Sequence, residues 1–227
     1  MSEPRIIAWG HADSVGVAGS SGTRETWEGL GVRSLGTGRV YRELFGRQDD
    51  TYRRLDRQSK SVVLAVAATG IDQLLTPELR EETALVTETV YGSLEVDLRY
   101  THFLELGVAH GAIFPYTLQS TCLGDVALRH GLRGPTISLS IDPDERGEAL
   151  AETRRMMALG ELRCAVVGAV DALESPLEAG GEVLDARLGA AYAVLATDDV
   201  PAPTILDWPA DGDLFRAVRE LGAQEPD

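Results

Sequence analysis

The stretch GPTISLSIDPDERGEALAET, residues 134–153, decides the fold that the sequence predicts. Residues 136–141 alternate polar and apolar side chains, which favours a β-strand. A helix is expected to follow over 145–159, and Asp142 and Pro143 suit its N-cap and its first position. The turn between the two elements presents four side chains: Asp142, Pro143, Asp144 and Glu145. The stretch therefore predicts a strand, a sharp turn and a helix, with no nucleophile in the turn.

Outward from this stretch, apolar strand patterns alternate with helical patterns, which predicts an α/β layered domain. The predicted strands are 5–10, 84–91, 136–141, 163–170 and 190–196, and the predicted helices are 23–30, 56–75, 95–108, 118–130 and 145–159. The segment 163–170 is nearly all apolar, which is typical of a strand buried on both faces. We expect a loop at 11–22 and irregular backbone at 31–50. The tail is expected to contain an edge strand at 204–206 and a short helix at 214–221.

Composition excludes several classes of partner. The 227 residues carry a formal net charge of −15, so we expect neither nucleic acid nor an anionic membrane surface as a partner. The two cysteines, Cys122 and Cys164, form no CxxC pair and no cluster with histidine, which predicts buried free thiols and no metal site. The N-terminus has no signal-peptide pattern, and no apolar run is long enough for a membrane span. We therefore expect a cytoplasmic protein.

Five stretches carry a resemblance to a known family: IIAWGHADSVGVAGSSGTRETWEGL (6–30), RRLDRQSKSVVLAVAATGID (53–72), ALVTETVYGSLE (84–95), RHGLRGPTISLSI (129–141) and MALGELRCAVVGAVDALESP (157–176). Together they resemble the N-terminal half of a β-ketoacyl synthase, of the thiolase superfamily. The resemblance implies a thiolase-like layered fold, its N-terminal half only, in which helices cover a mixed sheet. It places this domain at 1–198 and leaves 199–227 as a Pro- and acid-rich tail that packs on or flanks it. It implies no cofactor.

The resemblance also identifies a departure from catalysis. In ketosynthases the turn after this strand carries a Cys that attacks an acyl thioester, and the matching position here is Pro143. Asp144, Glu145 and Arg146 stand at the family's small Ser positions. The two catalytic His of the family lie in its C-terminal half, and the resemblance does not extend to that half. By itself the chain is therefore expected to be no enzyme, but a non-catalytic subunit of a β-ketoacyl synthase complex.

Type II polyketide systems contain such a subunit, the chain length factor, and this sequence resembles its truncated form from highly reducing, polyene-forming clusters. The resemblance implies a heterodimer with a ketosynthase, or a dimer of heterodimers, with the acyl carrier protein engaged through the ketosynthase. The implied interface is the strand Thr136, Ile137, Ser138, Leu139, Ser140 and Ile141. The implied floor of the acyl tunnel is Phe114, Tyr116, Thr117 and Ser120. Ordinary core positions for Phe114 and Tyr116 are the alternative.

Two other functions remain open from the sequence. One is a stand-alone enzyme, a decarboxylase or thioesterase on the same scaffold, for which Ser138, Ser140 and Cys122 are the nearby polar candidates; no His follows them in a triad pattern. The other is a regulatory scaffold that has kept only the fold. In a complete ketosynthase the C-terminal half covers one face of this domain. By that resemblance, the tail 199–227 covers the matching face here, or the face is exposed, or a partner covers it.

Overall fold

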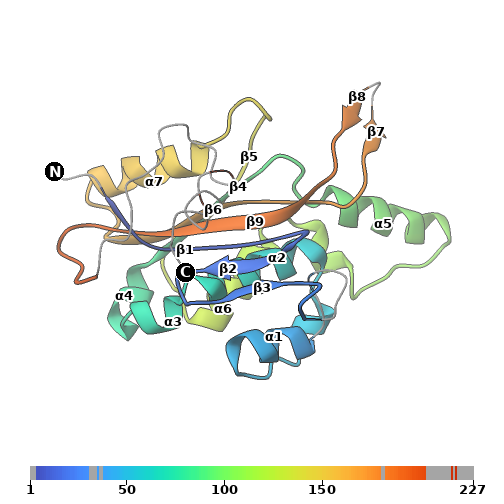
Figure 1. Ribbon diagram of the computed structural model, residues 1–227. Helices are drawn as coiled ribbons and strands as arrows, with labels where there is room; N and C mark the ends of the chain where they lie inside the picture. The colour runs from blue at the N-terminus through green and yellow to red at the C-terminus, as the bar shows by residue number, and fades with distance from the viewer. Residues whose placement is uncertain are drawn as a thin grey trace.

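A computed structural model of the chain describes residues 4–30, 35, 38–179, 182–202, 216 and 218. Their centre is a seven-stranded mixed sheet with the order β3-β2-β1-β9-β6-β4-β5 (Figure 1). The strands of this sheet are β1 Arg5–Asp13, β2 Gly16–Gly19, β3 Arg24–Thr26, β4 Ala84–Thr89, β5 Thr136–Ser140, β6 Cys164–Leu173 and β9 Arg187–Ala196. The separate hairpin, β7 Leu177–Ala179 and β8 Glu182–Leu184, projects away from the sheet (Figure 1).

Helices cover both faces of the sheet, as the α/β prediction requires (Figure 1). The α-helices are α1 Gly38–Phe45, α2 Arg57–Ala68, α3 Ile71–Leu74, α4 Pro77–Glu82, α5 Leu94–Glu105, α6 Thr121–His130 and α7 Glu148–Ala158, and the 3₁₀ helices are η1 Tyr52–Arg54 and η2 Phe114–Thr117. Helices α2 and α6 pack on one face, and α7 lies on the other. The face of α7 that packs on the sheet is buried: Ala149, Leu150, Thr153, Met156 and Met157.

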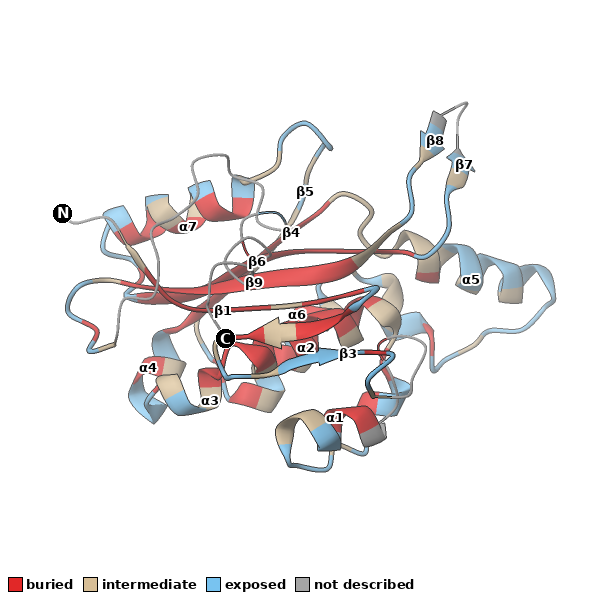
Figure 2. Cartoon of the chain, in the orientation of Figure 1, coloured by how far each residue is buried: buried red, intermediate tan, exposed pale blue. Residues whose placement is uncertain are grey.

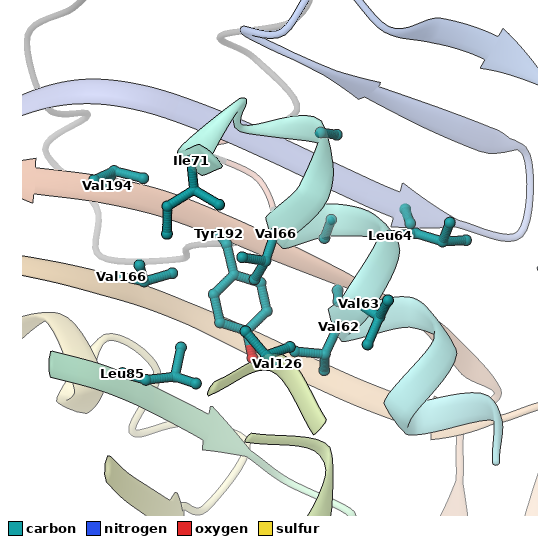
Figure 3. Close-up of a cluster of buried hydrophobic side chains, with 14 of the residues drawn as sticks. Val62, Val63, Leu64, Val66, Ile71, Leu85, Val126, Val166, Tyr192 and Val194 are labelled. Carbon is teal, nitrogen blue, oxygen red and sulfur yellow. The ribbon is translucent and has the colours of Figure 1, made fainter. Parts of the chain in front are cut away.

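The centre of the sheet is apolar on both sides. Every residue of β4 and β6 is buried, and these two strands pair in parallel. Strand β9 pairs antiparallel with β6 and with β1, so the sheet is mixed. Figure 3 shows the ring of Tyr192 on β9 among side chains of α2, α6 and β6, and its hydroxyl lies 2.7 Å from Thr87 Oγ1. The expectation that 163–170 is buried on both faces is confirmed for 164–170, whereas Arg163 is exposed and precedes β6.

The N-terminal region differs most from the prediction. Residues 23–30 were expected to be helical, but Arg24–Thr26 forms β3 against β2 and a turn follows. The expected loop at 11–22 instead contains the end of β1 and all of β2. A Cβ at Gly10 or Gly19 would overlap the backbone of α2, so glycine lets these strands lie directly on that helix. The supposedly irregular segment 31–50 contains helix α1.

The long helix predicted at 56–75 is divided in two. Helix α2 ends at Ala68, and Gly70 adopts a left-handed conformation with φ of 75° before α3 begins. Glycine takes this conformation without the steric cost that other residues meet. Pro77 begins α4, where the Thr76 side chain caps the first turn by accepting from Leu79 N.

Little of the tail is described. The expected edge strand at 204–206 lies outside the described residues, and of the expected helix at 214–221 only Arg216 and Val218 are described, both as helical. Val218 packs with Trp9 and Ala191 on the face of the sheet that also holds α7. In the described part of the chain, no helix has the length and apolar character needed to cross a membrane.

Candidate functional site

The candidate site begins at β5, an edge strand of the sheet. Of the strands that the structure describes, only β4 pairs with it, in parallel, and the side chains of β5 are exposed or partly buried where those of β4 are fully buried (Figure 2). Ile141 N donates to Thr89 O, and Leu85 N donates to Pro135 O. Backbone groups alternate in direction along a strand, so the N–H groups of residues 136, 138 and 140 point away from β4. The edge therefore presents backbone donors and acceptors to a further strand.

The turn after β5 presents Pro143 to solvent. Asp142 and Pro143 are both exposed, and the turn closes through Glu145 N donating to Asp142 O over 2.9 Å. The predicted cap at Asp142 and the first helical position at Pro143 are wrong: α7 begins at Glu148, and its N-cap is Gly147, with φ of 100°. The proline thus lies in the turn and not in the helix.

A different acid caps α7, and the sequence did not single it out. Glu88 lies on β4 and is 1% exposed. Its carboxylate accepts hydrogen bonds from Gly147 N, at 3.1 Å, and from Ala149 N, at 2.9 Å. Free N–H groups and the helix dipole favour an anion at this place. The anion is the chain's own carboxylate; the only signal in the sequence is an acid within the otherwise apolar and Thr-rich strand ALVTETVY.

A second buried acid, Asp171 on β6, orders the turn between β4 and α5. Its Oδ1 accepts from Thr89 Oγ1 at 2.9 Å, Val90 N at 2.9 Å and Tyr91 N at 3.0 Å. Burial raises the pKa of Asp171, although these hydrogen bonds oppose the rise. The turn in this way sets the direction in which α5 leaves the sheet.

The four predicted tunnel residues lie together on η2 and the start of α6, but they differ in exposure. Phe114 is 56% exposed, and its ring packs on Tyr100 in a tilted arrangement, with an interplanar angle of 51° and centroids 5.7 Å apart. Tyr116 packs against the main core cluster, and burial, followed by the charges of Asp125 and Asp56, raises its pKa. The sequence left open whether both rings were core residues, and that alternative describes the packing of Tyr116 but not the exposed ring of Phe114.

Thr117 and Ser120, the other two predicted tunnel residues, lie at the end of η2 and before the first turn of α6. Thr117 Oγ1 donates to Phe114 O at 2.8 Å, and Thr117 O accepts from Ser93 Oγ at 2.9 Å. Ser120 is exposed at the N-cap of α6. Next to it, Gln119 Oε1 accepts from Ser140 Oγ at 2.9 Å. This hydrogen bond joins the start of α6 to the end of β5, so the two predicted site regions are neighbours.

Apolar side chains are exposed along α5 and the loop that leads to η2 and α6. We call this segment, residues 94–118, the α5 arm; Figure 2 shows α5 as a mixture of exposed and intermediate residues, with Val96 as its buried residue. The large exposed apolar residues of the arm are Leu98, Leu104, Leu106, Val108, Phe114 and Leu118. Exposed apolar side chains that gather on one segment mark interaction sites more often than isolated ones do.

Both thiols and His130 are buried side chains. Cys122 and Cys164 are free and buried, and burial raises both pKa values, that of Cys164 to about 11. His130 is buried with its Nδ1 2.9 Å from Asp72 Oδ1. Among the described residues no group of three or more His, Cys, Asp or Glu is arranged to hold a metal ion.

Comparisons with known proteins agree on the fold. No family model matches the sequence. The curated 3-oxoacyl-[acyl-carrier-protein] synthase 2 of Vibrio cholerae is 29% identical over 101 residues, which are 44% of this chain and 23% of that synthase. The chain therefore matches less than a quarter of that relative's length.

Three solved structures are similar to the whole domain. The ishigamide ketosynthase/chain length factor matches 97% of this chain and 74% of its own, at 19% identity and a TM-score of 0.66. The ketosynthase ApeO in complex with its chain length factor ApeC, from Xenorhabdus doucetiae, matches 87% and 80%, at 13% identity and 0.55. A β-ketoacyl synthase from Burkholderia phymatum STM815 matches 86% and 59%, at 17% identity and 0.56. The chain has the thiolase-type layered fold of the β-ketoacyl synthases.

Proposed function

We propose that this chain is a non-catalytic chain length factor that pairs with an active ketosynthase and shapes the acyl tunnel in polyketide synthesis of the polyene type. Two of the similar structures are titled as ketosynthase and chain length factor together, which motivates the assignment. The proposal has three parts, which concern pairing, the absence of catalysis and the control of product length.

The open edge of β5 is the observation that supports pairing with a ketosynthase. Three outward N–H groups, at residues 136, 138 and 140, need a partner strand or water. A strand of the ketosynthase that pairs here would extend the sheet across the interface. The α5 arm lies at the end of this edge and would bury its exposed apolar side chains, such as Leu98 and Leu106, against the same partner.

The absence of catalysis follows from two residues. Pro143 has no nucleophilic atom, and it lies in an exposed turn rather than at a helix N-terminus. The N-terminus of α7, which would stabilise a thiolate, already binds the Glu88 carboxylate. A second anion at this place would be repelled by the first.

The control of product length is assigned to Phe114. Its exposed ring lies on the α5 arm, the apolar surface that we propose the ketosynthase covers. A bulky ring at the end of a tunnel would stop elongation by overlap with the growing chain. The acidic surface of this chain, with a net charge of −15, disfavours the docking of an acidic carrier protein. We therefore assign that docking to the ketosynthase.

A reconstitution assay tests the function directly. The ketosynthase encoded beside this chain would be supplied with its carrier protein and extender units, with and without this chain, and the products read by mass spectrometry. We expect no turnover by this chain alone and a defined product length only with both proteins. Turnover of a malonyl thioester by this chain alone would instead support the stand-alone enzyme, and identical products with and without it would support a scaffold.

A further inference from the structure

A cavity of about 360 Å³ opens at the base of α5, and nothing in the proposed function uses it. This volume lies within the range of about 300–1,000 Å³ that is typical of small-molecule sites. Its wall combines the first turn of α2, the start of α5, the Gly92–Ser93 backbone and Ala172 at the end of β6. Two helix N-termini, of twelve residues each, therefore meet at one cavity.

The cavity is cationic in a strongly acidic protein. Lys60, Arg57 and Arg99 line it, and Lys60 is the only lysine of the chain. Arg57 is held by Glu95 at 2.7 Å and by Glu174 at 2.6 Å. Lys60 and Arg99 make no ion pair with any described residue. Lys60 is partly buried, and burial lowers its pKa, although the charge of Asp56 opposes this shift. Its Nζ also lies 6.0 Å from the centroid of the Tyr52 ring.

The two acids that line the cavity already have partners. Asp56 caps α2, where its Oδ1 accepts from Ser59 N at 2.9 Å. Glu95 binds Arg57, and its Oε2 accepts from Glu174 N at 3.2 Å. Among the described residues, the charged side chains that line this cavity and form no ion pair or helix cap are Lys60 and Arg99, and both are positive.

Gln58 supplies an independent sign of a missing ligand. Its side chain lines the cavity and is 4% exposed, yet its Nε2 has no hydrogen-bond partner among the described residues. Buried amide groups are nearly always hydrogen-bonded, because an unpaired donor has lost its water without replacement. An acceptor within the cavity would satisfy this donor.

We propose that this cavity binds a small oxyanion, a phosphate monoester or a carboxylate, through Lys60, Arg99 and the amide of Gln58. Lys and Arg are the side chains that bind such groups through charge-assisted hydrogen bonds, and helix N-termini favour the same charge. The inference goes beyond the proposed function and holds or fails without any ketosynthase present.

The single lysine makes the test direct. A full-length sample labelled with ¹³C at lysine Cε gives one side-chain signal, which is titrated with inorganic phosphate and with acetate at constant ionic strength. We expect a saturable shift with one or both anions. Saturation by phosphate alone would assign a phosphate site, and saturation by acetate alone a carboxylate site. A shift that never saturates, and that equals the shift with chloride, would overturn the proposal.

Matched variants locate the site. Arg99→Gln should weaken binding of the saturating anion about tenfold by calorimetry, because one charge-assisted hydrogen bond is lost. Gln58→Glu should abolish binding, because it brings a carboxylate to the cavity at nearly unchanged shape. Arg42→Gln removes an equally exposed charge from α1, outside the cavity, and should leave affinity unchanged. Equal affinities of the Arg99 and Arg42 variants, both folded by circular dichroism, would contradict the assignment.

Discussion

Glu88 is the residue on which the order of the turn after β5 depends. It brings a buried carboxylate from β4 to the backbone of Gly147 and Ala149, 59 and 61 positions away in sequence. Glu88→Gln removes the charge but keeps the shape, and we expect a loss of about 1–2 kcal/mol in the free energy of unfolding, since hydrogen bonds to a charged group are the stronger kind. Urea denaturation measures it. The control is Glu145→Gln in the exposed turn, which should change stability by less than about 0.5 kcal/mol.

Phe114 and Tyr116 are two positions apart, and their substitutions should have different effects. Tyr116→Ala removes a ring that packs on the core and should cost about 2 kcal/mol of stability. Phe114→Ala removes an exposed ring and should cost about 1 kcal/mol or less, the order of one aromatic contact. In the reconstituted complex Phe114→Ala should lengthen the product, read by mass spectrometry. Unchanged product length with intact complex would remove Phe114 from the tunnel.

The edge strand β5 permits a sharp test at the scale of one element. The N–H of Ser138 points away from β4, so Ser138→Pro should change the stability of the chain by less than about 1 kcal/mol and yet prevent a further strand from pairing. Ser138→Ala keeps the N–H and should keep the complex. Leu139→Pro loses a donor to β4 and should destabilise the fold by about 3 kcal/mol. Co-purification with the ketosynthase measures pairing, and an unaffected complex with Ser138→Pro would show that β5 is not the interface.

The elements themselves were predictable to different extents. The strands at 84–91 and 163–170 and the buried face of α7 follow from apolar pattern, which local sequence carries. The start of α7 does not, because its cap comes from Glu88 on another strand. Strand β2 was missed because glycine-rich sequence predicts a loop, whereas here Gly19 permits contact with α2. Strand β3 was missed because residues 23–30 have a helical pattern, whereas Arg24–Thr26 pairs with β2. At the site, the sequence placed Phe114 and Tyr116 together, but residues two positions apart in one 3₁₀ helix can point inward or outward, and only packing decides which.

The whole molecule should lose stability in acid through Asp72. Burial by itself raises the pKa of this carboxyl, but the hydrogen bond with His130 and the charges of Arg47 and Arg80 outweigh it and hold the pKa below its ordinary value. A lowered folded pKa contributes stability above the unfolded pKa of about 4 and loses it as pH falls through the folded pKa. Urea unfolding at pH 7 and pH 3 should show this loss, and Asp72→Asn should reduce the difference. An equal pH dependence in the variant would contradict the role of Asp72.

At the scale of the whole molecule, the proposed function requires an obligate partner. Both the open edge of β5 and the apolar α5 arm are surfaces that a lone chain exposes to water. Because a partner that binds only the folded chain stabilises it by mass action, the chain should be more soluble and more heat-stable in the complex.

The most direct measurement is the native mass of the species purified after co-expression with the ketosynthase encoded beside this chain, with an affinity tag on one protein only. We expect a stable complex with equal numbers of the two chains, as one pair or a pair of pairs. A soluble monomer of this chain that does not retain the ketosynthase would contradict the chain-length-factor assignment.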